Sequence, residues 1–465
     1  MEAQKKDILK KIGEIADKEK LKVYAVGGYV RDTLMNRETN EIDFVIRGDG
    51  PYFAEKVKNQ LQGYGFTMYK QFGTASFNYK DMKLEFVSAR KESYQSESRK
   101  PDVESSSLED DLKRRDFTIN ALAMDISSGF FGDIIDPFNG RKDINKKIIR
   151  TPLDPEKTLY DDPLRIMRAA RFASQLQFSI EGKTFKAMKE ERHRIHIISQ
   201  ERITEELMKI LLSSKPSVGF KILKKVGLLE IIFPELDKMS GMEQRENHHH
   251  KDVFEHTLKV VDNLAQMTND KKLLFAGLVH DIGKPRVKKF IKGKGWTFHG
   301  HDYIGMKMLK GICRKLRLSN NMYNYASKLT RLHMRPIHLI DEEVTDSAIR
   351  RLLFDAGEEI EDLMILCRAD ITSGNPNRVK KHLKNFENVW KKMKEVEAKD
   401  KLRAFQSPVR GDEIMEICGI DPGPMVGKLK KAIEDAILEG EIPNDHDQAL
   451  EYLYTIKDDY LGDNL

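Results

Sequence analysis

The chain has 465 residues, of which 40% are hydrophobic and 33% charged, a balance that supports packed cores and excludes wholesale disorder. At roughly 100–200 residues per domain, this length predicts about three or four domains. No apolar run reaches the roughly 18–20 residues of a membrane helix, the N-terminus lacks a secretory signal, and three scattered cysteines argue against a disulfide framework. We therefore expect a cytoplasmic protein without a membrane partner. The net charge of +6 favours polyanionic partners only weakly.

Helix and strand patterns alternate over residues 1–150, and helical periodicity dominates afterwards. A helix is expected at about 5–18, and strands at 21–26, 41–46, 75–79, 84–87 and 121–126. Strands followed by a long run of helices predict an α+β fold, with a separate head on a helical body. The expected divisions are a head at 1–150, a neck and body at 151–245, a histidine-rich helical module at 246–375 and a helical tail at 376–465.

A pair of glycines, Gly27 and Gly28, closes the first strand, and a helix is expected to begin at Tyr29. Paired glycines let backbone N–H groups approach phosphate oxygens, and a helix N-terminus adds donors for an anion. Arg31 and Asp32 follow in the same segment, and the guanidinium could add positive charge to the anion site. A Gly-Gly turn before a helix is common, so the turn alone is weak support for phosphate binding.

Two carboxylates, Glu41 and Asp43, begin the next strand, and Glu85 lies in a later one. Positions i and i+2 of a strand project to the same face, so the first two carboxylates would repel each other unless a divalent cation lay between them. Mg²⁺ held there could activate an attacking hydroxyl and steady a leaving pyrophosphate. Most acid pairs at this spacing are solvated strand faces. The ordered combination of strand, Gly-Gly, helix and three acids is far more specific.

These residues resemble the polymerase-β-like nucleotidyltransferases, and the string GGYVRD…EIDF resembles class II tRNA nucleotidyltransferases, a family of CCA-adding enzymes and poly(A) polymerases. The resemblance implies a head with a mixed sheet and helices on an elongated all-α neck, with Glu41, Asp43 and Glu85 as catalytic residues. Glu41 departs from the family's usual Asp-x-Asp pattern. Its side chain is one methylene longer, so metal spacing or rate could differ.

Two further segments match the family. The segment KRRDFTIN contains Arg114, Arg115, Asp116 and Asn120, which the resemblance associates with phosphate and ribose; by itself it reads as an ordinary surface turn. The segment DDPLR contains Asp162 and Arg165, with Arg168 one turn later. A carboxylate and a guanidinium can pair with the amino group and ring nitrogen shared by cytosine and adenine, and leave uracil and guanine mismatched. The competing interpretation is a helix-start carboxylate in an exposed salt bridge. The family motif has Glu where this chain has Asp161.

A polar, serine-rich stretch of about 25 residues, 88–112, lies between the strand with Glu85 and these two segments. Connections of this length are usually functional or disordered. The resemblance identifies the stretch as the flexible loop of CCA-adding and A-adding enzymes, which CC-adding relatives lack. Its presence favours terminal AMP addition.

Nine of the thirteen histidines fall between 248 and 338. The set His256, His280-Asp281 and Asp370 on helices is suited to a divalent metal of unreadable identity and resembles the HD phosphohydrolase superfamily. His301 and His333 could complete a second site, whereas 248–250 could be surface histidines. The resemblance implies hydrolysis of phosphate esters or 2′,3′-cyclic ends. The tail glycines and lysines at 419–431, and the lysines at 380–384, could contact RNA backbone or be solvated faces.

The sequence therefore predicts a tRNA nucleotidyltransferase with an appended HD domain, acting as a monomer or homodimer on tRNA with CTP, ATP and Mg²⁺. It leaves open whether the enzyme adds all of CCA or only the terminal A. Two rivals are an HD-type phosphohydrolase whose head is a nucleotide-binding relic, supported only by Glu41, and a non-catalytic RNA-binding protein.

Overall fold

The computed structural model describes residues 2–70, 73–93, 102–105, 107–241, 252–293, 295–341, 345–372, 376–400 and 407–462. The chain divides into two compact units, Met1–Pro234 and Glu235–Leu465. The four divisions expected from the sequence are finer than these two units and stay a prediction. Among the described helices, none is both long and apolar enough to cross a bilayer.

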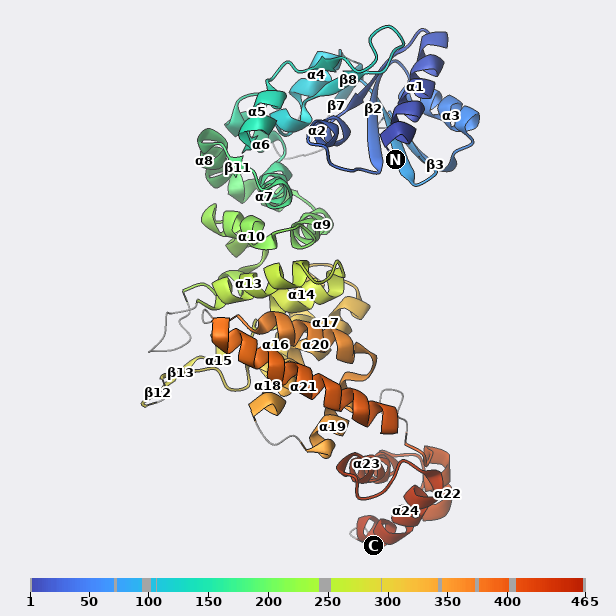
Figure 1. The fold of residues 1–465 in the computed structure, drawn as a ribbon, viewed down its shortest axis with the longest axis vertical. Coiled ribbons are helices and arrows are strands. Elements are labelled where there is room, and N and C mark those ends of the chain that lie inside the picture. Colours follow the sequence, from blue (N-terminus) through green and yellow to red (C-terminus); the bar gives the residue numbers. More distant parts are fainter. Residues whose placement is uncertain are drawn as a thin grey trace. The chain divides into compact units, whose positions relative to one another are not determined.

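The head contains a seven-stranded mixed sheet in the order β3-β4-β5-β2-β1-β8-β9 (Figure 1). Only β2 and β5 pair in parallel, and all other neighbours are antiparallel. The strands are β1 Lys22–Val26, β2 Glu41–Arg47, β3 Tyr64–Tyr69, β4 Thr74–Tyr79, β5 Met82–Ser88, β8 Ala123–Asp125 and β9 Ile134–Ile135. The predicted mixed-sheet head and the α+β fold class are confirmed.

Apolar residues on one face of the sheet form an aromatic core under helix α3. Phe86 stacks between Phe44 and Phe77, with ring centroids 4.8 and 5.6 Å away, and Phe53 meets it edge-on. Phe53 belongs to α3 (Gly50–Leu61), and α1 (Glu2–Lys18) packs beside β1 and α3. This aromatic packing holds β2 and β5 in place beside each other, and these strands bear the predicted carboxylates.

Two strands of the seven-stranded sheet, β3 and β9, were not expected from the sequence. Strand β3 is at the edge of the sheet with mostly exposed side chains, so it lacks the buried alternation that marks a half-buried strand. Strand β9 has only two residues. The serine-rich stretch includes an antiparallel pair, β6 (Arg90–Ser93) with β7 (Asp102–Ser105), and residues 94–101 lie outside the described part.

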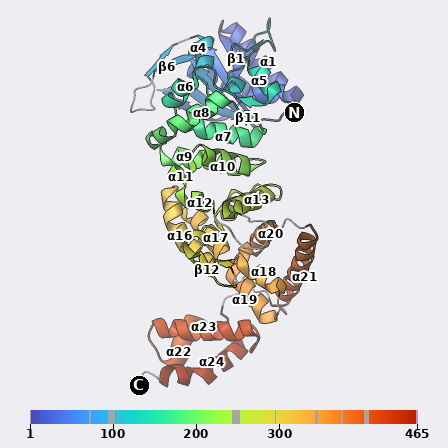
Figure 2. The ribbon, with the colours of Figure 1, turned by 90° about the vertical axis from the view of Figure 1, so that its left-hand side faces the viewer.

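Helices continue the first unit beyond the sheet. Helix α2 (Gly28–Leu34) follows β1, α4 (Leu108–Lys113) precedes the short helix η2 (Thr118–Asn120), and α5 (Gly140–Lys146) leads to the strand pair β10 (Ile148–Ile149) and β11 (Ser179–Ile180). Helix α7 packs against α9 and α10 (Figure 2). The neck helices are α6 Pro155–Asp161, α7 Leu164–Leu176, α8 Gly182–Glu191, η3 Arg192–Ile197, α9 Gln200–Leu211, α10 Pro216–Lys225, α11 Leu229–Ile232 and α12 Pro234–Asp237.

Where the structure describes the second unit, its regular elements are helices and one small hairpin, β12 (Lys289–Ile291) with β13 (Gly295–Thr297). Helix α14 packs against α13, α17 and α20, and this packing brings together the chain segments that carry the clustered histidines. The helices are α13 Val253–Ala265, α14 Lys271–Val279, α15 Lys284–Val287, α16 His301–Lys315, α17 Asn320–Leu332, α18 Met334–Asp341, α19 Asp346–Ala356, η4 Gly357–Glu359, α20 Ile360–Asp370 and α21 Pro376–Asp400.

The C-terminal helices α22 (Gly411–Cys418), α23 (Pro424–Glu439) and α24 (His446–Leu461) share a small apolar core. Ile414, Leu429, Ile433 and Leu453 are fully buried in it. The lysines of α23 and those at 380–384 in α21 are mostly exposed, so these residues remain candidates for RNA contact and for plain solvation alike.

Candidate functional site

Three adjacent strands bring the predicted carboxylates to the end of the glycine turn. Val26 of β1 pairs with Asp43 of β2, and Asp43 pairs in turn with Glu85 of β5. Because residues in register on neighbouring strands project to the same face, Asp43 and Glu85 lie side by side. Gly27 follows Val26 directly, so the turn begins beside this pair. The fold therefore joins a backbone turn suited to phosphate with two carboxylates suited to a cation.

Burial beside other carboxylates raises the pKa of Asp43 to about 6. Burial is the largest cause, and the negative charges of Glu85 and Glu41 add to it against the opposing charge of Arg115. Any cation that approaches this buried carboxylate stabilises its charged form. Lys83 supplies one, because its Nζ lies 2.8 Å from Oε1 of Glu41 and 3.5 Å from Oε2 of Glu85.

The carboxylate face fits a hard divalent cation in its chemistry but is not closed around one. Oxygen ligands and crowded negative charge are what Mg²⁺ favours. Within the described residues, however, the trios whose ligand atoms all lie within 4.8 Å of one another are in the histidine module and do not include Glu41, Asp43 and Glu85. Glu41 is exposed and pairs with Lys83. Incoming phosphate oxygens would have to supply further ligands, which is how Mg²⁺ is often held.

Gly27 is required at the turn for two reasons. Its φ is +70°, a conformation that L side chains rarely adopt, and a Cβ there would lie 2.6 Å from Nη1 of Arg115. Helix α2 begins at Gly28, one residue earlier than expected, and no side chain caps its first N–H groups. The turn thus keeps backbone donors and the Arg115 guanidinium together, which is an arrangement for an anion.

A buried chain of hydrogen bonds connects α2 to α7. Arg31 donates to Oδ1 of Asn120 at 2.7 Å, Asn120 donates to Oδ1 of Asp116 at 2.9 Å, and Arg168 donates to Oδ2 of Asp116 at 2.8 Å. Burial would raise the pKa of Asp116, but the charge of Arg168 and the bond from Asn120 bring it down to about 2. Arg31 also forms a double hydrogen bond with Asp32. Five predicted nucleotide-binding residues are thus held chiefly by one another.

Asp111 fixes the two neighbouring arginines, a role that sequence reasoning missed. This buried carboxylate accepts from Arg114 through Oδ1 and from Arg115 through Oδ2, at 2.5 and 3.1 Å for the closest pairs. It lies three and four residues before its partners, the spacing at which side chains of a helix meet. Arg115 also contacts the carbonyl oxygen of Asn120 at 3.5 Å. Asp111 therefore aims Arg115 at the Gly27 turn.

Asp162 and Arg165 lie where α6 ends and α7 begins. Oδ1 of Asp162 accepts from the backbone N–H of Leu164 at 3.2 Å, and the Arg165 guanidinium donates to the carbonyl oxygens of Thr158 and Arg114 at 3.1 and 2.6 Å. Both side chains are 8% exposed, so the exposed salt bridge considered above is wrong. Asp162 precedes the helix rather than lying within it, a difference caused by Pro163. Asp161 is half-buried, and burial raises its pKa.

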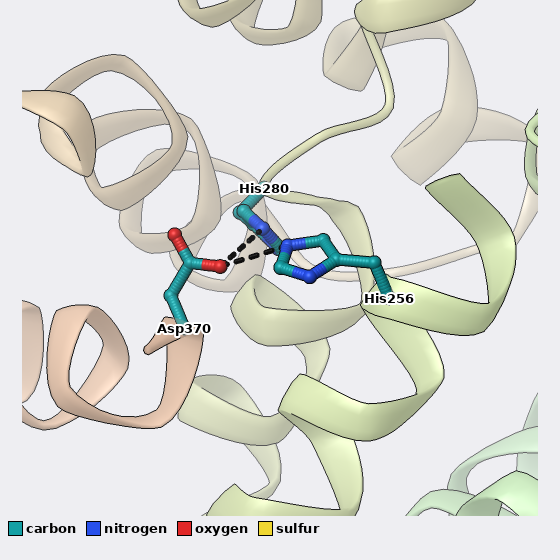
Figure 3. Close-up of side chains that lie close together, drawn as sticks. All are labelled: His256, His280 and Asp370. Atoms are coloured by element: carbon teal, nitrogen blue, oxygen red, sulfur yellow. Dashed lines mark ion pairs between the residues drawn. The ribbon is translucent and has the colours of Figure 1, made fainter. Parts of the chain in front are cut away.

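Side chains from several helices of the second unit converge on a cluster of histidines and aspartates (Figure 3). Nε2 of His256 lies 2.8 Å from Oδ1 of Asp370, and Nε2 of His280 lies 3.6 Å from the same oxygen. Asp281 adjoins them, with Oδ2 3.3 Å from Nε2 of His280. His256, His280 and Asp370 form one trio of potential ligands, and His280, Asp281 and His333 form another.

Four histidines are oriented by contacts on the far side of their rings. Nδ1 of His280 lies 2.8 Å from the carbonyl oxygen of Gly277, and Nδ1 of His301 lies 2.8 Å from that of Phe298. Nδ1 of His333 lies 2.7 Å from the carbonyl oxygen of Thr330, and Nδ1 of His256 lies 2.8 Å from Oγ1 of Thr372. Donation from Nδ1–H to an oxygen leaves Nε2 as the acceptor, which is the tautomer that binds metals. Nε2 of His280 and Oδ1 of Asp370 are buried and make no hydrogen bond, although the aspartate oxygen lies 2.8 Å from Nε2 of His256. These atoms fit a cation between them.

The charges within the cluster and burial shift the pKa values of two histidines in opposite directions. Burial alone would lower the pKa of His280, but Asp281 and Asp370 raise it to about 10. His333 has the opposite shift, since burial and the positive charge of His280 lower its pKa to about 4. His301 and His333 approach each other to 3.2 Å between Nε2 atoms, and His301 is 3.3 Å from Asp281. The predicted second group of ligands thus adjoins the first. Residues 248–250 lie outside the described part.

Three family models match parts of the chain. The Poly A polymerase head domain matches residues 23–150, the probable RNA and SrmB-binding site of polymerase A matches 177–240, and the HD domain matches 253–375. Each of the constellations described above falls inside or beside one of these ranges.

Relatives with assigned names cover most of the chain. The A-adding tRNA nucleotidyltransferase of Deinococcus radiodurans is 32% identical over 344 residues, which are 72% of this chain and 76% of the relative. The Multifunctional CCA protein of Shewanella frigidimarina is 32% identical over 371 residues, 76% of this chain and 84% of the relative. The crystal structure of the Bacillus stearothermophilus CCA-adding enzyme in complex with CTP is 24% identical, with a TM-score of 0.68 over 98% of both chains.

Proposed function

Because this chain belongs to the family of tRNA nucleotidyltransferases and poly(A) polymerases, we propose that it adds CMP and AMP to the 3′ end of tRNA without a nucleic-acid template. The observation that carries the proposal is the register Val26–Asp43–Glu85, which places the glycine turn beside two carboxylates on adjacent strands. In the reaction, the terminal 3′ oxygen bonds to the α-phosphorus of CTP or ATP. The bond between the α- and β-phosphates breaks, and pyrophosphate leaves.

The roles of the head residues follow from their charges and positions. Asp43, Glu41 and Glu85 would hold Mg²⁺, which when bound supplies positive charge to the attacking hydroxyl and the departing pyrophosphate. Gly27 leaves room for the triphosphate at the backbone, and Arg115 faces the same space. Gly28, Arg31 and Asp32 lie in α2, which follows this turn, and Asp111 binds both Arg114 and Arg115. The Asp116–Asn120 pair keeps Arg31 and Arg168 in place.

Base selection is proposed for Asp162 and Arg165. Both are buried and held by backbone contacts, so neither can turn away from a base that offers the wrong polarity. Arg165 has five N–H donors, of which two bind carbonyl oxygens, and a carboxylate accepts more than one hydrogen bond. Rejection of uracil and guanine follows because mismatched polar groups would remain buried and unpaired.

The test uses tRNA transcripts that end before the first C, after it and after CC, each with labelled CTP, labelled ATP and Mg²⁺. Incorporation of CMP and AMP into the two shorter acceptors, and of AMP into the CC-ended one, supports CCA addition, whereas AMP addition to the CC-ended transcript alone supports the A-adding alternative. No incorporation into any acceptor contradicts the proposal. Asp43→Asn keeps the side-chain volume and removes the charge, so this control should abolish incorporation while tRNA binding persists.

A second, additional activity is favoured by the geometry of the histidine–aspartate cluster. We propose that it binds a divalent metal and hydrolyses phosphate esters or 2′,3′-cyclic phosphates, as its HD family suggests. This activity would accompany nucleotide addition. The side-by-side placement of Asp43 and Glu85 argues against a head that is only a nucleotide-binding relic. The third hypothesis, a non-catalytic RNA-binding protein, explains neither constellation.

A further inference from the structure

The hairpin β12–β13 presents aromatic and basic side chains that no role described above uses. Phe290 is 50% exposed and Ile291 39% exposed, although both are apolar. The ring of Phe290 meets that of Trp296 edge-on with centroids 5.2 Å apart, and Nζ of Lys288 lies 4.1 Å from the centroid of Trp296. Exposed apolar side chains beside cations mark an interaction surface rather than a core.

The segment that contains the hairpin carries basic side chains and no acidic ones. Residues 282–301 contain no Asp or Glu, and they include Lys284, Arg286, Lys288, Lys289 and Lys292. Arg286, Lys289 and Lys292 are exposed, whereas Lys284 binds Asp281. In a chain whose acidic and basic residues nearly balance, twenty consecutive residues without an acid form a local positive surface.

Both ends of the hairpin are attached to the histidine–aspartate cluster. Before β12, Nζ of Lys284 lies 2.6 Å from Oδ2 of Asp281 and 5.7 Å from the ring centroid of Phe298. After β13, the carbonyl oxygen of Phe298 lies 2.8 Å from Nδ1 of His301. A ligand that extends along the hairpin towards its base therefore arrives at the cluster.

We propose that the hairpin β12–β13 binds single-stranded RNA and that its terminal nucleotide is directed to the histidine–aspartate cluster. Aromatic rings that stack on bases, together with lysines that contact the backbone phosphates, are the usual means of binding single strands without sequence preference. An acidic protein surface would use the lysines but gives the exposed Phe290 and the half-buried Trp296 no base to stack on. The proposal concerns the HD unit alone and does not depend on nucleotide addition by the head.

The chain contains only two tryptophans, Trp296 and Trp390, so stacking can be observed directly. In the full-length Trp390→Phe variant, Trp296 is the sole reporter, and a short oligouridylate is titrated while its fluorescence is followed. We expect saturable quenching that weakens as salt rises. In the converse variant, Trp296→Phe, the fluorescence of Trp390 should stay unchanged. RNA binding by the head cannot produce this signal, because the head has no tryptophan.

Further variants separate the contributions. Adding Lys289→Ala and Lys292→Ala to the Trp390→Phe reporter should weaken oligonucleotide binding. The slope of log affinity against log salt concentration should fall in magnitude by roughly 1.4, the value for two phosphate contacts on a single strand. Phe290→Ala should weaken binding about tenfold through lost stacking. Phe130→Ala is the matched control, because Phe130 is 59% exposed beside Lys22 in the head and should leave the quenching unchanged.

Three results would overturn the proposal. The first is no quenching of Trp296 while fluorescence anisotropy shows that the oligonucleotide is bound, since the RNA would then lie elsewhere. The second is equal quenching by polyglutamate, which would identify a general polyanion surface. The third is equal quenching by UMP, which would exclude an extended strand. Circular dichroism of each variant establishes that it is folded.

Discussion

Nη2 of Arg168 lies 2.6 Å from Oδ2 of Asp116, and this ion pair ties helix α7 of the neck to the motif that precedes η2 in the head. Asp116 is buried and also accepts from Asn120 and from the backbone N–H of Phe117. The pair therefore lies at the joint between the phosphate-binding and base-selecting parts of the proposed site. The strength of this ion pair can be measured from the pH dependence of the free energy of unfolding.

Asp116→Asn should destabilise the protein by about 2 kcal/mol at pH 7. The carboxyl pKa is lowered from 3.8 to about 2 in the folded state, and two units correspond to roughly that free energy. A lowered folded pKa gives stability that is present above pH ~4 and is lost as the pH falls towards 2. The difference in free energy of unfolding between wild type and variant should shrink over this window. Urea titrations at pH 7 and pH 3 measure it, with the exposed Asp81→Asn as control.

Gly27→Ala should weaken triphosphate binding and lower stability by about 1–2 kcal/mol. The positive φ strains any L residue by roughly this amount, and the added Cβ would meet Nη1 of Arg115 at 2.6 Å. We expect the KM for CTP and ATP to rise by at least tenfold. Gly129→Ala is the matched control, because nothing lies within 4 Å of its Cβ and its φ is not positive. Equal KM values in the two variants would argue against a triphosphate at this turn.

Lys83→Met should lower the Mg²⁺ concentration needed for half-maximal activity. The hydrogen bond to Glu41 raises the pKa of Lys83. Its ammonium competes with a divalent cation for that carboxylate and for Glu85. The pair is largely exposed, so the effect is modest, up to roughly fivefold. Rates measured across a Mg²⁺ series give the value, and Lys80→Met, on the neighbouring turn, should match wild type. A rise in the Mg²⁺ requirement would contradict the competition.

Asp162→Asn should relax base choice more than it weakens nucleotide affinity. The amide replaces an acceptor-only carboxylate with a group that also donates, so the keto bases lose much of their mismatch. We expect incorporation of UMP or GMP to rise relative to CMP and AMP, measured with all four triphosphates in competition. A variant as selective as wild type would remove Asp162 from the base site.

His280→Ala combined with Asp281→Ala should abolish metal binding by the second unit and leave nucleotide addition intact. The two metal constellations belong to separate compact units, and the double change removes two of the clustered ligands together. Bound metal measured by mass spectrometry after chelator treatment and reloading should fall in the variant. Loss of CMP and AMP incorporation as well would show that the units depend on each other.

Local sequence was sufficient for the ordered motifs and for most head strands. Strands β1, β2, β4, β5 and β8 lie close to the expected ranges. Short apolar runs mark β1, β2 and β8, and alternating burial marks β4 and β5. The edge strand β3 was missed because its side chains are exposed. Lys83 could have been anticipated from its i, i+2 spacing to Glu85, and Asp111 from its helical spacing to Arg114 and Arg115.

By itself, the sequence determined which residue types were available: glycines before a helix, acids on strands, an Asp–Arg pair and clustered histidines. Such patterns can be recognised in the sequence because the periods of strands and helices determine which residues share a face. Only the tertiary structure decided that Asp43 adjoins Glu85, that Asp116 binds Arg168, and that Asp281 lies between His280 and His301. These pairings join segments from different elements, and packing of sheet and helices sets them rather than any local rule.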